Sequence, residues 1–139
     1  MSRLLSPVSL PDVVEKLDAI IWEADPATGK FTFVSEGVRK ILGCPPSRWV
    51  DDPAFWLSSV HPDDREAAKA CFRGGDDGHT AEFRIRAADG RTVWLHNRIG
   101  TLRADGGGEC RFGVMTDVTE RKRLAAQQRA IAHFGQLAL

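Results

Sequence analysis

The stretch of sequence that decides the fold is residues 80–119, TAEFRIRAADGRTVWLHNRIGTLRADGGGECRFGVMTDVT. Over residues 81–87, apolar and polar side chains alternate, which gives an extended strand one apolar face and one charged face. The dipeptide Asp89-Gly90 then favours a tight hairpin turn, because glycine adopts positive φ without steric cost. The sequence therefore predicts a strand, a hairpin turn and a return strand over residues 91–102.

This hairpin continues into a third strand and then into a charged segment. A glycine-rich break at residues 104–108 precedes a strand expected over 110–118, which completes a three-stranded antiparallel meander. The following residues, 119–123, are TERKR and begin a predicted helix. Apolar residues at steps of seven, three and four form a short heptad-like seam in it: Leu124, Ile131, Phe134 and Ala138. A seam of this length cannot hold two chains together by itself.

The residues before the meander predict two more strands and several short helices. The spacing of apolar residues predicts an amphipathic helix over residues 11–18. The apolar segments 20–24 and 31–34 are separated by a turn and predict a strand pair. The helices expected after this pair lie between Ser35, which can cap a helix, and Gly43, around residues 47–50 and around residues 54–58.

The segment His61-Pro62-Asp63-Asp64 is expected to open the longest helix of the body. Proline suits the first helical position, and the two aspartates complement the positive end of the helix dipole. Gly74-Gly75 is expected to end this helix. His61 is therefore assigned a structural role at the helix start, in preference to an acid–base role.

Composition restricts the classes of function. The 139 residues are 42% hydrophobic and 27% charged, which suits one globular domain. Nineteen basic and nineteen acidic residues leave no net charge, so a nucleic-acid or anionic-membrane partner has no electrostatic support. No apolar run has the roughly 20 residues that a membrane span needs, and a cytoplasmic location is expected. Cys44, Cys71 and Cys110 are odd in number and widely spaced, which predicts buried thiols and neither a disulfide framework nor a zinc site.

In this order and spacing, the sequence resembles the PAS sensory domains of bacteria. The resemblance depends on these motifs: Trp56…His61-Pro62-Asp63-Asp64, Glu82-Phe83-Arg84-Ile85, Ala88-Asp89-Gly90…Trp94, and Gly113…Asp117-Val118-Thr119-Glu120-Arg121-Lys122. It implies an α+β fold, a five-stranded antiparallel sheet with short helices over one face. The domain organisation expected is an N-terminal amphipathic helix in residues 1–18, a sensory domain in 19–118, and the start of a C-terminal signalling helix in 119–139.

The resemblance also implies a regulatory role. Such a domain stands at the head of a longer signal-transduction protein, commonly a histidine kinase or a cyclic-dinucleotide enzyme, and it is non-catalytic itself. A homodimer and a C-terminal output domain are the expected partners. A ligand-free structural dimerisation module remains the alternative, with the apolar stripe of the 11–18 helix covering either the exposed sheet face or a second chain.

Two sets of site residues are predicted. Asp117 and Thr119 lie where strand becomes helix, and their short polar side chains can fix the angle at which the helix leaves the sheet. Trp94 joins them as a residue for signal transmission. A small pocket, if one exists, is expected to be lined by Phe33, Ile41, Trp56, Cys71 and Phe83.

No cofactor or metal is predicted, and an unknown small molecule remains possible. Flavin-binding relatives carry an Asn-Cys-Arg-Phe-type motif that this sequence lacks, and haem-binding relatives place a histidine in the longer helix, where residues 63–73 contain none. His79, His96 and His133 lie on different predicted elements without the spacing of metal ligands. An enzyme using Cys71 or His61 is disfavoured, because no nucleophile is paired with a base and an orienting group.

Overall fold

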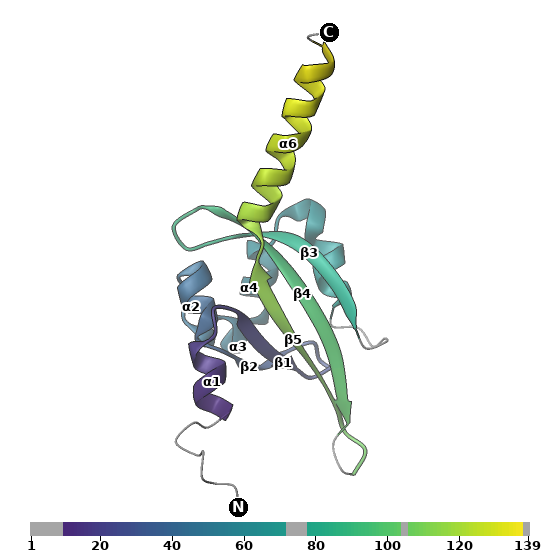
Figure 1. The fold of residues 1–139 in the computed structure, drawn as a ribbon. Helices are drawn as coiled ribbons and strands as arrows, with labels where there is room; N and C mark the ends of the chain where they lie inside the picture. The colour runs from purple at the N-terminus through teal and green to yellow at the C-terminus, as the bar shows by residue number, and fades with distance from the viewer. Residues whose placement is uncertain (1–9, 72–77, 104–105, 138–139) are drawn as a thin grey trace, which may run out of the picture.

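The computed structural model describes residues 10–71, 78–103 and 106–137, and these form a five-stranded antiparallel sheet flanked by helices (Figure 1). The elements in chain order are α1 (Leu10–Lys16), β1 (Ile20–Ala24), β2 (Phe31–Val34), α2 (Gly37–Leu42), α3 (Pro46–Asp51), α4 (Pro53–Ser59), η2 (Pro62–Asp64), α5 (Arg65–Ala70), β3 (His79–Arg86), β4 (Thr92–Arg103), β5 (Glu109–Asp117) and α6 (Thr119–Leu137). The predicted α+β fold class is confirmed.

The strand order is β2-β1-β5-β4-β3, so the first strand lies beside the last one. All four strand pairings are antiparallel. The β3–β4–β5 meander agrees with the prediction, whereas the pairing of β1 with β5 joins residues about ninety positions apart. In this pairing Trp22 lies opposite Gly113.

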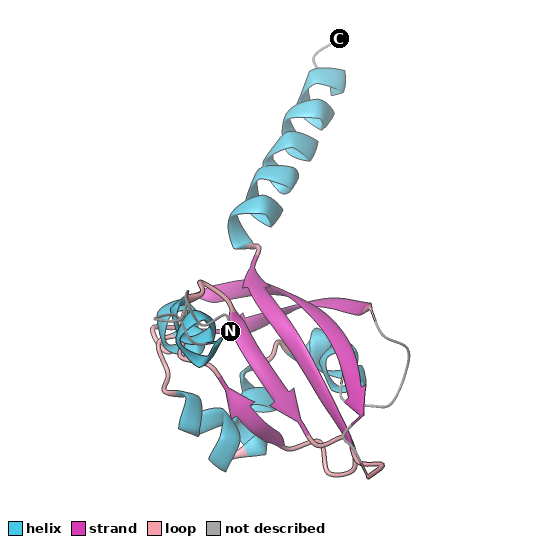
Figure 2. Cartoon of the chain, turned by 60° about the horizontal axis from the view of Figure 1, so that its bottom comes forward, coloured by secondary structure: helices cyan, strands magenta, loops and turns pink. Residues whose placement is uncertain are grey.

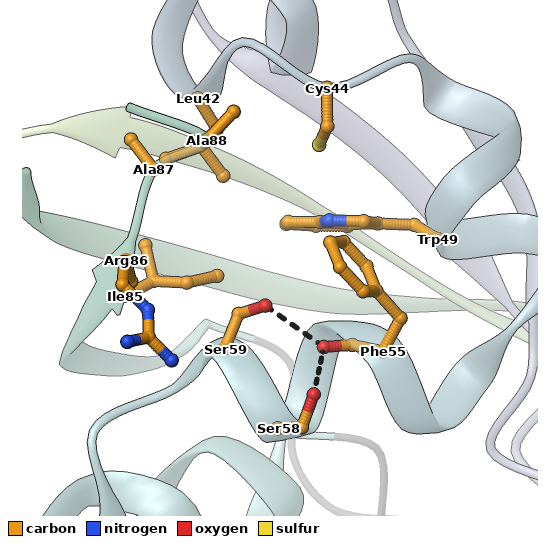
Figure 3. Close-up of a pocket in the computed structure, with 10 residues that line it drawn as sticks. All are labelled: Leu42, Cys44, Trp49, Phe55, Ser58, Ser59, Ile85, Arg86, Ala87 and Ala88. Carbon is orange, nitrogen blue, oxygen red and sulfur yellow. Dashed lines mark hydrogen bonds between the residues drawn. The ribbon is translucent and has the colours of Figure 1, made fainter. Parts of the chain in front are cut away.

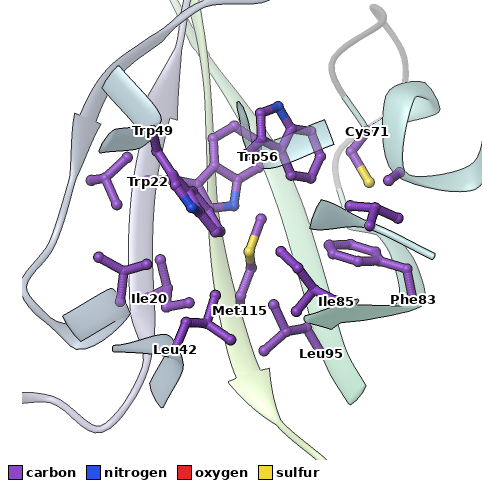
Figure 4. Close-up of a cluster of buried hydrophobic side chains, with 14 of the residues drawn as sticks. Ile20, Trp22, Leu42, Trp49, Trp56, Cys71, Phe83, Ile85, Leu95 and Met115 are labelled. Carbon is purple, nitrogen blue, oxygen red and sulfur yellow. The ribbon is translucent and has the colours of Figure 1, made fainter. Parts of the chain in front are cut away.

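One face of the sheet packs against the short helices and forms the core (Figure 2). The alternation of buried and accessible residues along β3, β4 and β5 directs every second side chain to this face. The labelled strand residues of the core include Ile20, Trp22, Phe83, Ile85, Leu95 and Met115 (Figure 4). Phe31 contacts the rings of Trp49 and Trp56 at centroid distances of 5.3 and 5.5 Å, so the aromatic residues are core residues.

A bulge in β2 changes the side to which Phe33 points. The β1–β2 register shifts between Glu23 and Ala24, which pair with Phe33 and Phe31 respectively. Phe31 is therefore buried in the core, whereas Phe33 lies on the opposite face with 39% of its surface exposed. Because Phe33 lies on the outer face, it cannot line a pocket inside the core, and this part of the pocket prediction is wrong.

The helix expected to open at His61 is divided and short. His61 does sit at the helix start, where its Nδ1 accepts the Asp63 N–H at 3.1 Å. However, η2 is a three-residue 3-10 turn, and α5 has six residues against seven in α4, so the prediction of the longest body helix is wrong. The Asp64 carboxylate pairs with Arg84 at the edge of β3 and draws the turn toward the sheet. Gly74 and Gly75 lie outside the described residues.

Ser35 does not cap α2 with its side chain. Its Oγ accepts the Ile21 N–H at 2.9 Å and donates to the Ala19 carbonyl at 3.4 Å, so it connects the end of β2 to the start of β1.

The N-terminal helix occupies Leu10–Lys16, and residues 1–9 lie outside the described residues, as does Ala138. The C-terminal helix α6 projects away from the sheet (Figure 1). Within the described residues, no helix combines the length and apolar character that a membrane crossing requires.

Candidate functional site

Hydrogen bonds close the junction between β5 and α6. Thr119 donates from its backbone N and its Oγ1 to Asp117 Oδ1, at 2.9 and 2.6 Å. The Thr119 hydroxyl oxygen accepts the Trp94 backbone N–H at 2.9 Å, and Val118 N donates to the Trp94 carbonyl at 2.8 Å. The β4–β5 ladder ends at the pair Leu95–Asp117, so these bonds continue it into the helix. The structure thus brings together the three residues that the sequence singled out, Asp117, Thr119 and Trp94.

Glu82 holds the first turn of α6 from a second strand. Its carboxylate lies 2.6 Å from Lys122 Nζ and 2.6 Å from Arg121 Nη2. The same carboxylate lies 2.9 Å from His96 Nδ1, on the residue directly opposite Glu82 in the β3–β4 ladder. Hydrogen bonding by Lys122, followed by that of His96 and Arg121, lowers the pKa of Glu82 to about 2. Glu82 is therefore ionised and connects β3, β4 and α6.

The indole of Trp94 extends this contact network to the edge of the sheet. Lys122 Nζ lies 4.7 Å from one ring centroid of Trp94, and Arg84 Cζ lies 5.2 Å from it, within cation–π range. Arg84 in turn donates through Nε and Nη2 to the Asp64 carboxylate at 2.8 and 2.9 Å. This bidentate pair lowers the pKa of Asp64. Contacts therefore run without a gap from α6 through Trp94 to η2.

A small hollow of about 220 Å³ lies between the α2–α3 connection, α4 and the end of β3 (Figure 3). Its lining consists of Leu42, Cys44, Trp49, Phe55, Ser58, Ser59, Ile85, Arg86, Ala87 and Ala88. Ser58 and Ser59 donate their hydroxyl protons to the Phe55 carbonyl at 2.8 and 2.9 Å. Burial raises the pKa of the Cys44 thiol, which disfavours the nucleophilic thiolate. The hollow can hold a small apolar group, and its lining residues offer no activated nucleophile.

The family model described as PAS fold matches residues 31–115, which is more than half of the chain. The chain belongs to the PAS family. The match begins in β2 and ends in β5, so it covers the short helices and the meander.

Three similar proteins illustrate the family likeness. The N-terminal domain of a diguanylate cyclase with PAS/PAC sensor from Marinobacter aquaeolei is 27% identical, with a TM-score of 0.63 over 75% of this chain and 98% of that one. A sensory box histidine kinase/response regulator from Burkholderia thailandensis is 28% identical, with a TM-score of 0.65 over 88% of this chain and 92% of that one. The uncharacterized protein y4lL of Sinorhizobium fredii is 35% identical over 77 residues. This match spans 51% of the present chain but only 9% of the length of that relative.

The five residues predicted to line a pocket in this PAS domain do not surround one cavity. Trp56, Cys71 and Phe83 are buried in the core, and Ile41 packs against the core from α2. Phe33 faces the other side of the sheet, and none of the five lines the hollow of Figure 3. Phe33 instead borders a shallow apolar hollow together with Ile21 and three residues of α1: Pro11, Val14 and Glu15.

Sequence reasoning missed the role of Glu82 at the junction. Its outward position follows from the alternation in β3, and the basic pair Arg121-Lys122 follows from the sequence, but their meeting depends on where α6 leaves the sheet. Over residues 10–71, 78–103 and 106–137, no three His, Cys, Asp or Glu side chains gather as a metal site would require.

Proposed function

We propose that this PAS domain is the input module of a bacterial signal-transduction protein and passes a conformational change through α6 to an output domain. The names of two similar structures support this proposal, since one is a diguanylate cyclase with a PAS/PAC sensor and the other a sensory box histidine kinase. A PAS domain is typically non-catalytic, so the kinase or cyclic-dinucleotide activity would belong to the output domain. The three free thiols suit the reducing cytoplasm, where we place the protein.

The observation that carries the proposal is the double attachment of α6 to the sheet. Thr119 receives a hydrogen bond from β4, and Arg121 and Lys122 are paired with Glu82 of β3. The opposite face of both strands packs in the core. A change in the core that shifts β3 against β4 would therefore displace the first turn of α6.

The test compares two aspartate variants in the full-length protein. Asp117→Ala removes the acceptor for both Thr119 bonds, which should cost about 1 kcal/mol and change output activity about fivefold. Asp25→Ala is the matched control, because Asp25 Oδ1 accepts the Ala27 N–H at 2.9 Å in the β1–β2 turn, away from α6. It should lower the melting temperature without changing output. Equal melting-temperature losses with unchanged output in both variants would reduce Asp117 to a helix cap.

We further propose that the domain acts as a homodimer. Large apolar side chains are exposed on the outer face of the sheet and on α6: Phe33, Phe112, Val114, Leu124, Ile131 and Phe134. The sevenfold spacing of Leu124 and Ile131 suits a parallel pair of α6 helices, and the sheet face would supply the area that so short a seam lacks. A ligand-free dimerisation module is the alternative function, and it would form the same dimer while Asp117→Ala left output unchanged.

A further inference from the structure

A second hollow, of about 330 Å³, lies where η2 and the start of α5 meet the end of β3, the edge strand of the sheet. Three of the residues that line it are arginines, Arg65, Arg84 and Arg86, and a fourth is His61. None of its lining residues within the described chain is acidic. Arg86 also borders the hollow of Figure 3, where its guanidinium is drawn. The walls of this second hollow are therefore basic.

Two of the three guanidinium groups have no counter-charge. Arg65 donates through Nε to the Val60 carbonyl at 3.0 Å and through Nη2 to the Ser58 carbonyl at 3.2 Å, and both acceptors are neutral. Arg86 is exposed and makes no ion pair or hydrogen bond through its side chain with any described residue. The two carbonyls fix the orientation of Arg65, so little side-chain freedom remains to be lost when an anion binds.

The nearby carboxylates do not neutralise this excess. Asp64 accepts from Arg84 Nε and Nη2 at 2.8 and 2.9 Å, so these two charges compensate each other. Arg84 Nη1 makes no hydrogen bond within the described part of the chain. The side chain of Asp63 is 78% exposed, and its carboxylate lies 3.9 Å from His61 Nδ1, so solvent screens its charge. The other two arginines therefore keep an excess of positive charge.

Neutral donors complete the lining of the hollow. His61 Nδ1 accepts the Asp63 N–H at 3.1 Å, so in the neutral ring the proton is on Nε2, which is then a donor. Thr92 of β4 lies opposite Arg86 in the β3–β4 ladder, and its hydroxyl also lines the hollow. Donors from the start of η2, from α5, from β3 and from β4 thus surround one space.

We propose that this hollow binds the phosphate group of a small phosphate monoester. Such a group carries close to two negative charges and three strong acceptor oxygens, which match two uncompensated guanidinium groups and the neutral donors. The hollow is larger than a bare phosphate ion, and Val60, Pro62 and Ile85 offer apolar surface to the attached organic group. The site does not include the junction of β5 with α6, so its binding can be tested whether or not the proposed function holds.

The test is titration calorimetry of the whole chain with glycerol 3-phosphate at about pH 7.5, where the ester is a dianion, and at constant ionic strength. Saturable binding of one ester per chain with a Kd of about 1 mM or lower is expected. Inorganic phosphate and sulfate should bind at least about fivefold more weakly. Equal affinity for all three would show general attraction of dianions, and tighter binding of a tetraglutamate peptide would show an acidic-peptide surface; either result would overturn the proposal.

Two variants and one control locate the site. Arg86→Met should weaken binding at least about tenfold and keep the wild-type melting temperature, because Arg86 is exposed. Arg65→Met should weaken binding to a similar extent. Arg103→Met removes the same charge at the opposite end of β4, where Arg103 is 77% exposed beside Glu109, and should bind like wild type.

The wild-type protein gives a readout that needs no variant. In NMR titrations with glycerol 3-phosphate, the shifted backbone amides should cluster in residues 59–65, 84–86 and 92, which contain the lining of the hollow. Shifts centred elsewhere, no saturable binding to the wild type, or full affinity in Arg86→Met would contradict the proposal.

Discussion

Gly113 of β5 shows how a single residue shapes the inner face of the sheet. A Cβ atom at this position would lie 2.5 Å from atoms of the Trp22 indole, closer than any real Cβ contact. The close approach lets the indole lie flat on β5 and reach Asn97. The absence of a side chain is therefore required by the core and not by the local backbone conformation.

We expect Gly113→Ala to destabilise the domain by about 1 to 3 kcal/mol, because the indole must move in a packed core. Urea unfolding followed by tryptophan fluorescence measures this loss. Gly135→Ala is the control, since Gly135 lies on the exposed part of α6 with nothing within 4 Å of the added methyl. It should leave the free energy of unfolding unchanged or raise it by up to about 1 kcal/mol. Equal stability of the two variants would show that the Trp22 contact is not restrictive.

The ionisation of Glu82 makes the stability of the folded domain depend on pH. Its pKa is lowered from 4.5 to about 2 in the folded protein, so its stabilising effect is fully present above pH 4.5 and is lost as the pH falls toward 2. After allowance for solvent screening, Glu82→Gln should cost on the order of 1 to 2 kcal/mol at pH 7. The difference from wild type should shrink between pH 4.5 and 2.

The matched variant for this measurement is Glu120→Gln. Glu120 pairs with Arg123 within α6, and both side chains are largely exposed, so the loss of this pair should lower the free energy of unfolding at pH 7 much less than the loss of Glu82 does. Unfolding free energies of the three proteins across pH 2 to 7 make the comparison. A Glu82→Gln protein as stable as wild type at pH 7 would show that its three partners compensate by binding water.

At the scale of elements, the strands agree with the sequence more closely than the helices do. The segments 20–24 and 31–34 are strands with the predicted bounds, because alternation and turn residues are local signals. The helix predicted to open at His61 is instead divided into η2 and α5. The sequence could not reveal this, because the division involves the ion pair of Asp64 with Arg84, which lies on β3, twenty residues further along the chain. The short polar residues at the start of α6 were correctly placed at the strand–helix boundary.

The junction of β5 and α6 allows a prediction on its dynamics. Thr119→Val removes the hydroxyl that accepts the Trp94 N–H and donates to Asp117, while keeping the shape of the side chain. Amide exchange at Trp94 and in the first turn of α6 should become faster by about fivefold or more, as expected for a loss of about 1 kcal/mol. Thr119→Ser retains the hydroxyl and should exchange like wild type. Unchanged protection in Thr119→Val would show that the Glu82 contacts alone hold the helix.

At the scale of the whole molecule, α6 projects away from the sheet (Figure 1). The apolar side chains of Leu124, Ile131 and Phe134 form an exposed stripe along it. If a second copy covers this stripe, Ile131→Glu should raise the dimer dissociation constant tenfold or more, because a charge would be buried in the seam. Light scattering across a concentration series measures this. Ala126→Glu adds the same charge outside the seam and should leave the dimer intact. A wild-type chain that stays monomeric, or equal weakening by both variants, would argue against the α6 pairing.

The sequence by itself determined the strands, the hairpin turn, the meander and the junction residues Asp117 and Thr119. These depend on alternation, turn chemistry and capping, which act between near neighbours in the chain. The tertiary structure decided the pairing of β1 with β5, the outward position of Phe33, the contacts of Glu82 with α6 and the burial of Arg111. Each of these depends on side chains that meet across distant segments, where packing and paired charges, and not local preference, set the lowest free energy.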